Sequence, residues 1–282
     1  MSNLTNQEKY QSQLTITDDD KNLVHGGLRL KKTFKKRKNE LLISIITVVL
    51  NGEKYLEETI KSVINQSNKN FEYIIIDGGS TDQTLDIIKK YDDQIDYWVS
   101  QKDEGIYDAF NKGLTLTCGD VVGIINSDDT YNKECLGIVK TYFQEDKELD
   151  FIFGGVKKRW GTLHGYKPWK IVLSWGFYTS HSTGFFIKND SAKKLGFYNL
   201  KYKYSSDFDL FYRMIVKHKM KGTGTKKNEV FGNFRSGGFS STVSFKDHFK
   251  EGIKIRFDNG QNKMIIGLII ILKFLKNIKK FL

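Results

Sequence analysis

An apolar run, Val121-Val122-Gly123-Ile124-Ile125, ends directly in the polar sequence Asn126-Ser127-Asp128-Asp129. The run has the length and composition of a buried β-strand. In open α/β sheets, ligands bind beyond the carboxyl ends of the strands, so this position predicts a ligand site. Adjacent carboxylates repel each other unless a cation lies between them and a ligand. Hard oxygen ligands suit Mg²⁺ or Mn²⁺, and the stretch therefore predicts a divalent-metal site held by Asp128 and Asp129.

Two further apolar runs end in polar residues in the same way. Residues 71–76 predict a buried strand that leads into Asp77-Gly78-Gly79-Ser80, and residues 41–49 predict another that ends at Leu50-Asn51-Gly52. The glycines after Asp77 allow a sharp turn and the close approach of a ligand. Three predicted strands therefore carry polar residues at their carboxyl ends, which meet at one edge if the strands are parallel.

A predicted helix follows each of the last two strands. Ser80 and Gln83 have the spacing of a capping box at the start of the helix after Asp77. Alternating strands and helices indicate an α/β fold with a mostly parallel sheet flanked by helices. The apolar residues that mark the two helices are Leu56, Ile60, Val63 and Ile64 in the first, and Leu85, Ile87 and Ile88 in the second.

Four motifs resemble those of glycosyltransferase family 2, in the family's order. They lie at residues 47–52, 77–84, 103–113 and 126–129. Residues 181–186, 205–213 and 234–241 resemble the branch of that family found in bacterial O-antigen and capsule gene clusters. The resemblance covers residues 41–245. It implies a Rossmann-like GT-A fold and an inverting transfer of sugar from a nucleotide-sugar donor, with Mn²⁺ or Mg²⁺ as the metal.

The same resemblance implies roles for individual residues. Asp77 would contact the base of the nucleotide. Asp207 matches the family's catalytic aspartate, and as a general base it would take the proton of the acceptor hydroxyl. Asp209 would pair with Arg213, four residues on, if residues 205–217 are helical. The residues expected around the rest of the nucleotide sugar are Thr47, Asn51, Tyr55, Ser80, Asp103, Asn111, Lys112 and Asp128.

Three departures from the family pattern refine this expectation. Asn126 stands where many members have aspartate, so metal binding would depend on Asp128 and Asp129. Ser206-Asp207 replaces a common Glu-Asp pair and keeps only the aspartate. The Gln-x-x-Arg-Trp motif of processive synthases is missing from the sequence, which favours the transfer of a single sugar over polymerisation.

Length and composition indicate one large domain with two extensions. The chain has 282 residues, of which 39% are hydrophobic, which is enough for a substantial core. Cys118 and Cys135 give neither a disulfide framework nor metal-ligand spacing, and this favours the reducing cytosol. We expect a polar and basic extension over residues 1–40 and a catalytic domain over 41–245. Within that domain, residues 41–130 would bind the nucleotide sugar and residues 131–245 the acceptor, and residues 246–282 would form a basic helical segment.

The net charge of +12 is concentrated in the two extensions. Residues 29–38 contain seven basic and no acidic residues, and residues 246–282 contain nine basic and three acidic ones. A nucleic-acid-binding enzyme would spread its positive charge over the working face, so nucleic acid is not an expected partner. Flanking basic segments suit an anionic membrane surface. Solvated charge that maintains solubility is the alternative.

The C-terminal segment predicts an amphipathic helix at the membrane interface. Residues 264–272 are uncharged, but they are far fewer than the ~20 needed to span a bilayer. The alternative is a helix packed on the body of the enzyme or on a partner subunit, and the oligomeric state stays open. The predicted polar stripe contains Lys273, Lys276 and Lys280, and the predicted apolar side contains Phe274, Leu275, Ile278, Phe281 and Leu282.

The function expected from these features is the transfer of one sugar to a hydroxyl of a saccharide acceptor, itself linked to polyprenyl diphosphate, during synthesis of a bacterial surface polysaccharide. The enzyme would be cytoplasmic and peripheral on the inner face of the membrane. Two alternatives are a catalytically inactive sugar- or nucleotide-binding assembly factor and a sugar nucleotidyltransferase. The four aspartates at 77, 128, 129 and 207 disfavour the first. The second normally has a Gly-rich N-terminal loop bearing Arg or Lys, which this sequence lacks.

Overall fold

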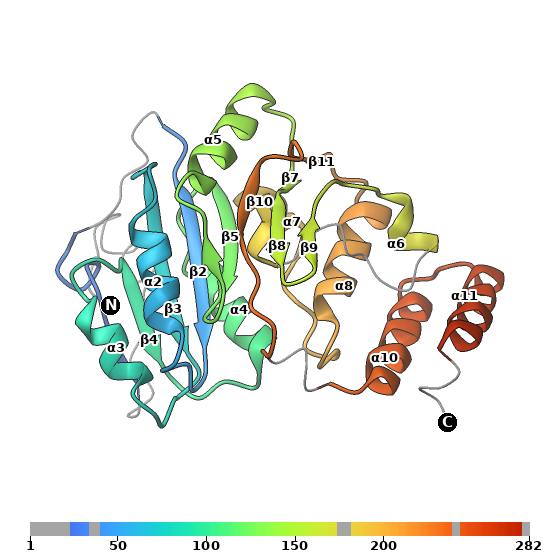
Figure 1. The fold of residues 1–282 in the computed structure, drawn as a ribbon, viewed down its shortest axis with the longest axis horizontal. Coiled ribbons are helices and arrows are strands. Elements are labelled where there is room, and N and C mark those ends of the chain that lie inside the picture. The colour runs from blue at the N-terminus through green and yellow to red at the C-terminus, as the bar shows by residue number, and fades with distance from the viewer. Residues whose placement is uncertain (1–22, 34–39, 174–181, 239–242, 278–282) are drawn as a thin grey trace, which may run out of the picture.

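A mixed β-sheet with helices on both faces forms the centre of the molecule (Figure 1). The computed structural model describes residues 23–33, 40–173, 182–238 and 243–277. Within them the main sheet has eight strands in the order β1-β4-β3-β2-β5-β10-β7-β11. Their bounds are β1 Val24–Gly26, β2 Ile43–Val49, β3 Phe71–Asp77, β4 Tyr97–Ser100, β5 Val121–Asn126, β7 Phe151–Phe153, β10 Phe185–Lys188 and β11 Gly222–Gly224.

The three strands predicted from the sequence, β2, β3 and β5, are adjacent and parallel. Val49 in β2 is opposite Asp77 in β3, and Val48 is opposite Asn126 in β5. The polar ends of the three strands therefore meet at one edge of the sheet, as predicted. The sheet continues through β10 and β7, so residues on both sides of position 130 belong to one sheet.

Two layers of helices cover the sheet because successive side chains of its central strands point to opposite faces. In β2, Ile43 and Ile45 pack against α2 and α5, whereas Ile46 and Val48 face the layer that contains α4 and α8. The first layer comprises α2 (Leu56–Ile64), α3 (Thr84–Lys90) and α5 (Cys135–Glu145). The second comprises α4 (Ile106–Thr115), α7 (Asn189–Leu195) and α8 (Ser206–Tyr212).

The predicted capping box at Ser80 and Gln83 is not formed. Helix α3 begins at Thr84, and Gln83 makes no side-chain capping hydrogen bond. The carboxylate of Asp82 accepts a hydrogen bond from the Thr84 N–H at 3.0 Å instead. The Ser80 hydroxyl donates to Asp77 and accepts from the Asn51 N–H, so Ser80 joins the two strand ends rather than capping the helix.

A second, four-stranded sheet brings a late segment of the chain back to the end of β5. Its order is β6-β12-β8-β9, and β12 pairs antiparallel with β6, which follows directly after Asp129. Residues 234–238 therefore lie beside Asp128 although more than 100 residues separate them in sequence. The bounds of its strands are β6 Thr130–Tyr131, β8 Gly155–Lys158, β9 Gly161–Leu163 and β12 Val230–Asn233. Three short helices lie elsewhere in the chain: α6 Trp169–Leu173, η1 Ser182–Gly184 and η2 Arg213–Lys217.

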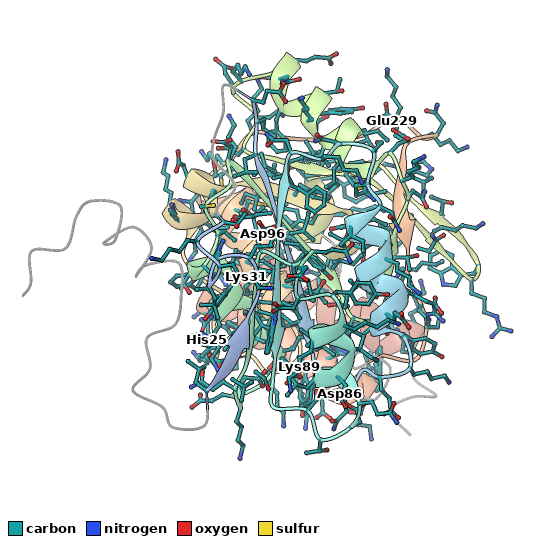
Figure 2. All side chains as sticks on the ribbon, turned by 90° about the vertical axis from the view of Figure 1, so that its left-hand side faces the viewer. His25, Lys31, Asp86, Lys89, Asp96 and Glu229 are labelled. Carbon is teal, nitrogen blue, oxygen red and sulfur yellow. The ribbon has the colours of Figure 1, made fainter. Side chains whose placement is uncertain are left out.

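Part of the predicted N-terminal extension belongs to the body of the molecule, on the side shown in Figure 2. Strand β1 pairs antiparallel with β4, and the His25 ring lies 2.8 Å from the Tyr97 hydroxyl. Arg29 is buried and forms an ion pair of 2.6 Å with buried Glu72. The predicted boundary at residue 40 is therefore corrected over residues 23–33, because a buried ion pair and a strand hold this segment in place. Residues 1–22 and 34–39 lie outside the described residues.

The C-terminal segment also packs on the body, as a helical hairpin of α10 (Phe245–Asp258) and α11 (Lys263–Lys276). Buried Arg256 donates hydrogen bonds to the carbonyl oxygens of Ile171 and Val172, which fixes the hairpin to α6. No helix in the described part of the chain is long and apolar enough to cross a bilayer.

The predicted polar stripe of the C-terminal helix is corrected at one position. Lys273 is only 6% exposed and lies over the rings of Phe245 and Phe249, so it faces α10 rather than solvent. Lys276 is exposed, as expected, and so are Phe274 and Leu275. Lys280, Ile278, Phe281 and Leu282 lie outside the described residues.

Candidate active site

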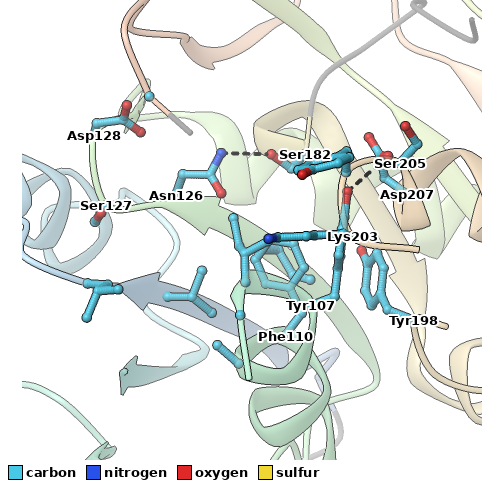
Figure 3. A pocket seen from close by; sticks show the side chains of 18 of the residues that line it. Tyr107, Phe110, Asn126, Ser127, Asp128, Ser182, Tyr198, Lys203, Ser205 and Asp207 are labelled. Atoms are coloured by element: carbon cyan, nitrogen blue, oxygen red, sulfur yellow. Dashed lines mark hydrogen bonds between the residues drawn. The ribbon is translucent and has the colours of Figure 1, made fainter. Parts of the chain in front are cut away.

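A cleft of about 1460 Å³ opens at the carboxyl edge of β2 and β5 (Figure 3). Its walls come from the loops after these strands, the start of α4, the start of α8, residues 234–238 and the C-terminal hairpin. The sequence-predicted site residues that line it are Asn51, Tyr55, Asp103, Asp128 and Asp207. Six other predicted residues do not line it: Thr47, Asp77, Ser80, Asn111, Lys112 and Asp129.

The turn that carries Asp128 is fixed from two sides. The Thr59 hydroxyl of α2 donates hydrogen bonds to the carbonyl oxygens of Ser127 and Asp129, at 2.9 and 2.7 Å. Nε of Arg235 donates to the Asp128 carbonyl at 3.1 Å. Gly238 lies so close that a Cβ atom there would be 2.7 Å from Oδ2 of Asp128, so a larger residue at this position would displace the carboxylate. Burial raises the pKa of the Asp128 carboxyl above its ordinary value.

Asp129 supports this turn from below the cleft. Its side chain is fully buried. Oδ2 accepts a hydrogen bond from the Thr183 hydroxyl at 2.6 Å, and Oδ1 accepts one from the Arg235 N–H at 2.9 Å. Burial raises the pKa of this carboxyl to about 7. The two adjacent aspartates thus differ in position, because only Asp128 presents its carboxylate to the cleft.

Asn126 supplies an oxygen that the sequence did not place in the metal site. Its Nδ2 atom donates to the Ser182 hydroxyl at 3.2 Å, which orients the amide. The buried Oδ1 atom has no hydrogen-bond partner among the residues that the structure describes. This oxygen and the Asp128 carboxylate fit a hard divalent cation, which takes a few protein oxygens and completes its shell with water or phosphate. Within the described ranges, the cleft included, no group of three His, Cys, Asp or Glu side chains gathers as a metal site.

Asp77 and Thr47 lie beneath the cleft floor. Asp77 is fully buried, and its carboxylate accepts hydrogen bonds from the hydroxyls of Ser80 and Ser100. The Thr47 hydroxyl lies 3.0 Å from the Tyr73 hydroxyl inside the sheet. Asp77 acts on the cleft through Ser80, whose Oγ accepts a hydrogen bond of 2.7 Å from the Asn51 N–H.

Asn111 and Lys112 connect parts of the scaffold. The Asn111 amide exchanges two hydrogen bonds of 2.9 Å with the backbone of Tyr198, which ties α4 to the segment before α8. Lys112 forms an ion pair of 3.1 Å with Asp108 and donates to the Lys102 carbonyl. Both residues therefore support the cleft wall from behind.

Asp103 and Tyr55 face the cleft from opposite loops. Oδ1 of Asp103 accepts a hydrogen bond from the Gly105 N–H at 2.9 Å, and burial raises the pKa of its carboxyl. Gly78 leaves room for this carboxylate, since a side chain there would collide with Asp103. The Tyr55 ring is covered by the Arg235 guanidinium at 3.9 Å, which leaves the ring's position well defined.

Asp207 lies in the first turn of α8 and faces the cleft. Oδ1 accepts hydrogen bonds from the Phe208 N–H at 2.8 Å and from the Tyr107 hydroxyl at 3.3 Å. The surrounding protein raises the pKa of this carboxyl, and the two hydrogen bonds oppose that change. The helical condition for the pair between Asp209 and Arg213 is met, because α8 continues directly into the π-helical turn η2.

Asp209 points away from the cleft, into the scaffold. It is buried and accepts hydrogen bonds from Arg213 Nε at 2.8 Å and from Asn259 Nδ2 at 2.7 Å. The predicted pair between Asp209 and Arg213 is confirmed. Of these two aspartates of α8, Asp207 therefore faces the cleft, and Asp209 holds the helix to its neighbours.

Several lining residues were missed by the sequence analysis. Tyr107 belongs to the motif at residues 103–113 and stacks on Tyr198, with ring centroids 5.5 Å apart. That motif was a usable signal for Tyr107, whereas no local pattern marks the basic residues of the opposite wall. The missed lining residues that bear on the site are Tyr107, Asn126, Ser182, Tyr198, Lys203, Ser205, His248 and Lys273.

Comparisons with known protein sequences agree with this geometry. The model of the family described as "Glycosyl transferase family 2" matches residues 44–218. The chain is 28% identical over 223 residues to the PGL/p-HBAD biosynthesis glycosyltransferase of Mycobacterium tuberculosis, covering 74% of this chain and 83% of that protein. It is 35% identical over 114 residues to the putative teichuronic acid biosynthesis glycosyltransferase TuaG of Bacillus subtilis, covering 39% and 42%.

Solved structures show the same fold at low sequence identity. Residues 1–349 of S. aureus TarS in complex with UDP-GlcNAc superpose with a TM-score of 0.64 at 19% identity, covering 83% of this chain and 73% of that one. The mannosyltransferase PcManGT of Pyrobaculum calidifontis, in complex with GDP-Man and Mn²⁺, gives 0.60 at 15% identity, covering 82% and 68%. The predicted GT-A fold is thereby confirmed.

Proposed function

This chain belongs to glycosyl transferase family 2, and on that premise we propose that it transfers one sugar from a nucleotide-sugar donor to a hydroxyl of a saccharide acceptor, with inversion at the anomeric carbon. Family membership makes the protein a glycosyltransferase. The roles of individual residues, the metal and the acceptor are the proposal. One observation carries it: the carboxylates of Asp128 and Asp207 face the same cleft from different elements, while their neighbours Asp129 and Asp209 are held in the scaffold.

The donor would bind at the end of the cleft that contains Asp128. Asn126 Oδ1 and the Asp128 carboxylate would hold Mn²⁺ or Mg²⁺, and Asp129 would keep their turn in position. When bound, the metal stabilises the negative charge that grows on the leaving nucleoside diphosphate. Asn51, Tyr55 and Asp103 would line the nucleoside part of the site, with Asp103 able to accept hydrogen bonds from ribose hydroxyls. The neighbouring structures with UDP-GlcNAc and with GDP-Man and Mn²⁺ support a donor of this class.

Asp207 would be the general base. A sugar hydroxyl is a weak nucleophile and must lose its proton as it attacks the anomeric carbon. The proton would pass to the Asp207 carboxylate, whose raised pKa makes it a stronger base than an ordinary aspartate. The hydrogen bond from Tyr107 would orient the carboxylate for this transfer. Attack opposite the leaving group inverts the anomeric configuration.

The acceptor would be a saccharide linked to polyprenyl diphosphate, reached at an anionic membrane surface. Helix α11 leaves one apolar face exposed, and the same hairpin carries exposed lysines, as expected for a helix at a lipid interface. The five side chains that define this outer face of α11 are Met264, Leu268, Ile271, Leu272 and Leu275, each more than half exposed. The exposed lysines nearby in the hairpin are Lys246, Lys250, Lys254, Lys263 and Lys276.

This arrangement supports a peripheral enzyme on the cytoplasmic face of the membrane. Relatives carry names that refer to PGL/p-HBAD and teichuronic acid biosynthesis. We extend this to synthesis of a bacterial surface polysaccharide of the O-antigen or capsule type. Nucleic acid is not part of the proposal.

A panel of nucleotide sugars, incubated with Mn²⁺ and with synthetic lipid-linked saccharides, tests the proposal directly. The expected products are a nucleoside diphosphate and an acceptor heavier by one sugar, with the anomeric configuration inverted in the NMR spectrum. The Asp207→Asn protein is the matched control, because it keeps the cleft shape and lacks the base. Release of pyrophosphate, a retained anomer, or no turnover with any donor would contradict the proposal.

A further inference from the structure

The wall of the cleft around Asp207 carries three basic side chains, those of Lys203, His248 and Lys273. The C-terminal hairpin contributes His248, Gly252 and Lys273 to the lining, and the segment before α8 contributes residues 203–205. Figure 3 shows Asp128 on one side of the cavity and Ser205 and Asp207 on the other. The acceptor hydroxyl must reach Asp207 if that residue is the base, so this wall would face the acceptor rather than the donor's diphosphate.

Lys273 is an unusual residue for a cleft wall. Its side chain is 6% exposed, and its amine lies 5.5 Å and 4.8 Å from the ring centres of Phe245 and Phe249. Burial, and then repulsion from Arg256, lowers the pKa of the amine to about 8.

Lys203 and His248 bring further nitrogen atoms to the same wall. Lys203 extends across the cleft, with its amine toward the middle of the cavity in Figure 3. The Nδ1 atom of His248 lies 3.2 Å from the Ser205 hydroxyl, which holds the imidazole beside the start of α8. Glu251 is the carboxylate nearby on α10, and its two oxygens already accept hydrogen bonds from the N–H groups of Lys203 and Tyr204.

We propose that Lys203, His248 and Lys273 form a subsite for a phosphate or diphosphate group on the acceptor. Lysine amines bind phosphate as point charges and need no planar partner, in contrast to arginine. The subsite would hold the charged end of the acceptor on the hairpin side of the cleft while its sugar hydroxyl reaches Asp207. This inference rests on the proposed function, and it names the chemistry that would select the acceptor.

Two sources could supply the anion. A lipid-linked saccharide carries a diphosphate between sugar and lipid, whereas a phosphate-containing glycan carries a phosphodiester within the polymer. The outer face of α11 belongs to the same hairpin as Lys273 and agrees with the first source. Both sources present the same chemistry to the three residues, and the choice between them is made by experiment.

The test compares three acceptors that share one saccharide: a short alkyl diphosphate glycoside, a phosphodiester-linked oligomer without lipid, and a neutral alkyl glycoside. In Lys273→Met and Lys203→Gln, KM for the charged acceptors should rise roughly ten- to hundredfold, as expected for a lost charge-assisted hydrogen bond. KM for the neutral acceptor and for the donor should stay unchanged. Preference of the wild type for the first or second acceptor identifies the source. Lys89→Met, an exposed lysine on α3 that lies outside the cleft lining, is the control.

Equal effects on charged and neutral acceptors, or no effect of either variant, would overturn the subsite. Lys203 is exposed, so its variant keeps the test valid if Lys273→Met unfolds. A binding measurement separates this result from failure of the proposed function. The wild type and Lys273→Met are titrated by calorimetry with a short alkyl diphosphate. Excess chelator is present, so that binding through the metal does not contribute. The wild type should bind the diphosphate, and Lys273→Met should bind it with an affinity lower by roughly tenfold or more. Binding without any turnover would retain the subsite and reject the proposed reaction, and no binding by the wild type would reject the subsite.

Discussion

The hydroxyl of Tyr107 donates a hydrogen bond of 3.3 Å to the carboxylate of Asp207, across 100 residues of sequence. Tyr107 lies in the first turn of α4, and Asp207 lies in the first turn of α8. The tyrosine ring is itself held by stacking on Tyr198. The helix that begins beside Asp103 thus orients the carboxylate proposed to act as base, and the two halves of the cleft are connected through one side chain.

Replacing Asp207 by asparagine keeps the shape of the side chain but removes the proton acceptor. We expect kcat to fall roughly 10²–10⁴-fold. Donor affinity should change little, because the proposed nucleotide site is formed by other residues. Steady-state kinetics and a donor titration check both statements. Near-normal turnover by the asparagine variant would exclude Asp207 as the base.

Activity should depend on pH through the Asp207 carboxyl. The surrounding protein raises its pKa above the ordinary value, and a general base must be unprotonated, so kcat/KM should fall as the pH drops through that raised pKa. The hydrogen bond from Tyr107 stabilises the charged form and holds the pKa down. In Tyr107→Phe the acidic limb of the profile should therefore move to higher pH. An unchanged limb, with a lower rate at every pH, would mean that Tyr107 acts only through packing.

Metal binding should depend on Asp128 more than on Asp129. Asp128→Asn is expected to weaken Mn²⁺ binding, measured by calorimetry with the nucleoside diphosphate present, and to reduce kcat/KM by roughly 10²–10³-fold, because several kcal/mol of charge stabilisation are lost. Asp129→Asn should bind Mn²⁺ nearly as well, since both of its oxygens are already used in hydrogen bonds within the protein. An equal loss of Mn²⁺ affinity in the two variants would support the prediction from the sequence that Asp128 and Asp129 both bind the metal.

Removal of the Asp209 carboxylate should lower the free energy of unfolding without a direct effect on the transfer reaction. Asp209→Ala leaves the half-buried side chains of Arg213 and Asn259 without their shared acceptor, at a cost of roughly 1–3 kcal/mol in the free energy of unfolding. Asp207→Asn is the matched comparison. The folded state holds a proton on Asp207 more tightly than the unfolded chain does, so its charge opposes folding at neutral pH, and its neutral variant should be no less stable. Urea titration of the two variants measures the difference, and equal destabilisation would contradict this division of roles.

The outer face of α11 should bind anionic vesicles. A double change, Leu268→Glu with Ile271→Glu, places two negative charges on exposed apolar positions and should abolish co-sedimentation with vesicles while leaving turnover of a water-soluble acceptor intact. High salt should also weaken binding of the wild type, because the basic residues are screened beyond a Debye length of about 8 Å at physiological ionic strength. Trp160→Glu, an exposed apolar position between β8 and β9, is the control. A wild type that ignores vesicles would reject the membrane proposal.

The sequence alone determined the local elements and the edge of the sheet where the site lies. Apolar runs at residues 41–49, 71–76 and 121–125 predicted buried strands, and the polar residues after them meet because these strands pair in parallel. Given a helix over residues 205–217, the pair between Asp209 and Arg213 also followed from spacing, since residues four apart share a helix face.

Only the tertiary structure decided which of these polar residues reach the cleft. Neighbouring side chains of the motif Asn126-Ser127-Asp128-Asp129 point in different directions. Asp128 faces the cleft, whereas Asp129 is held in the scaffold by its hydrogen bond from Thr183. Contacts between distant segments leave no local pattern in the sequence. Lys273, for example, lines the cleft and is buried only because α11 packs on α10. Burial also raised the pKa of Asp129 to about 7, because the cost of a charge depends on the atoms that replace water around it.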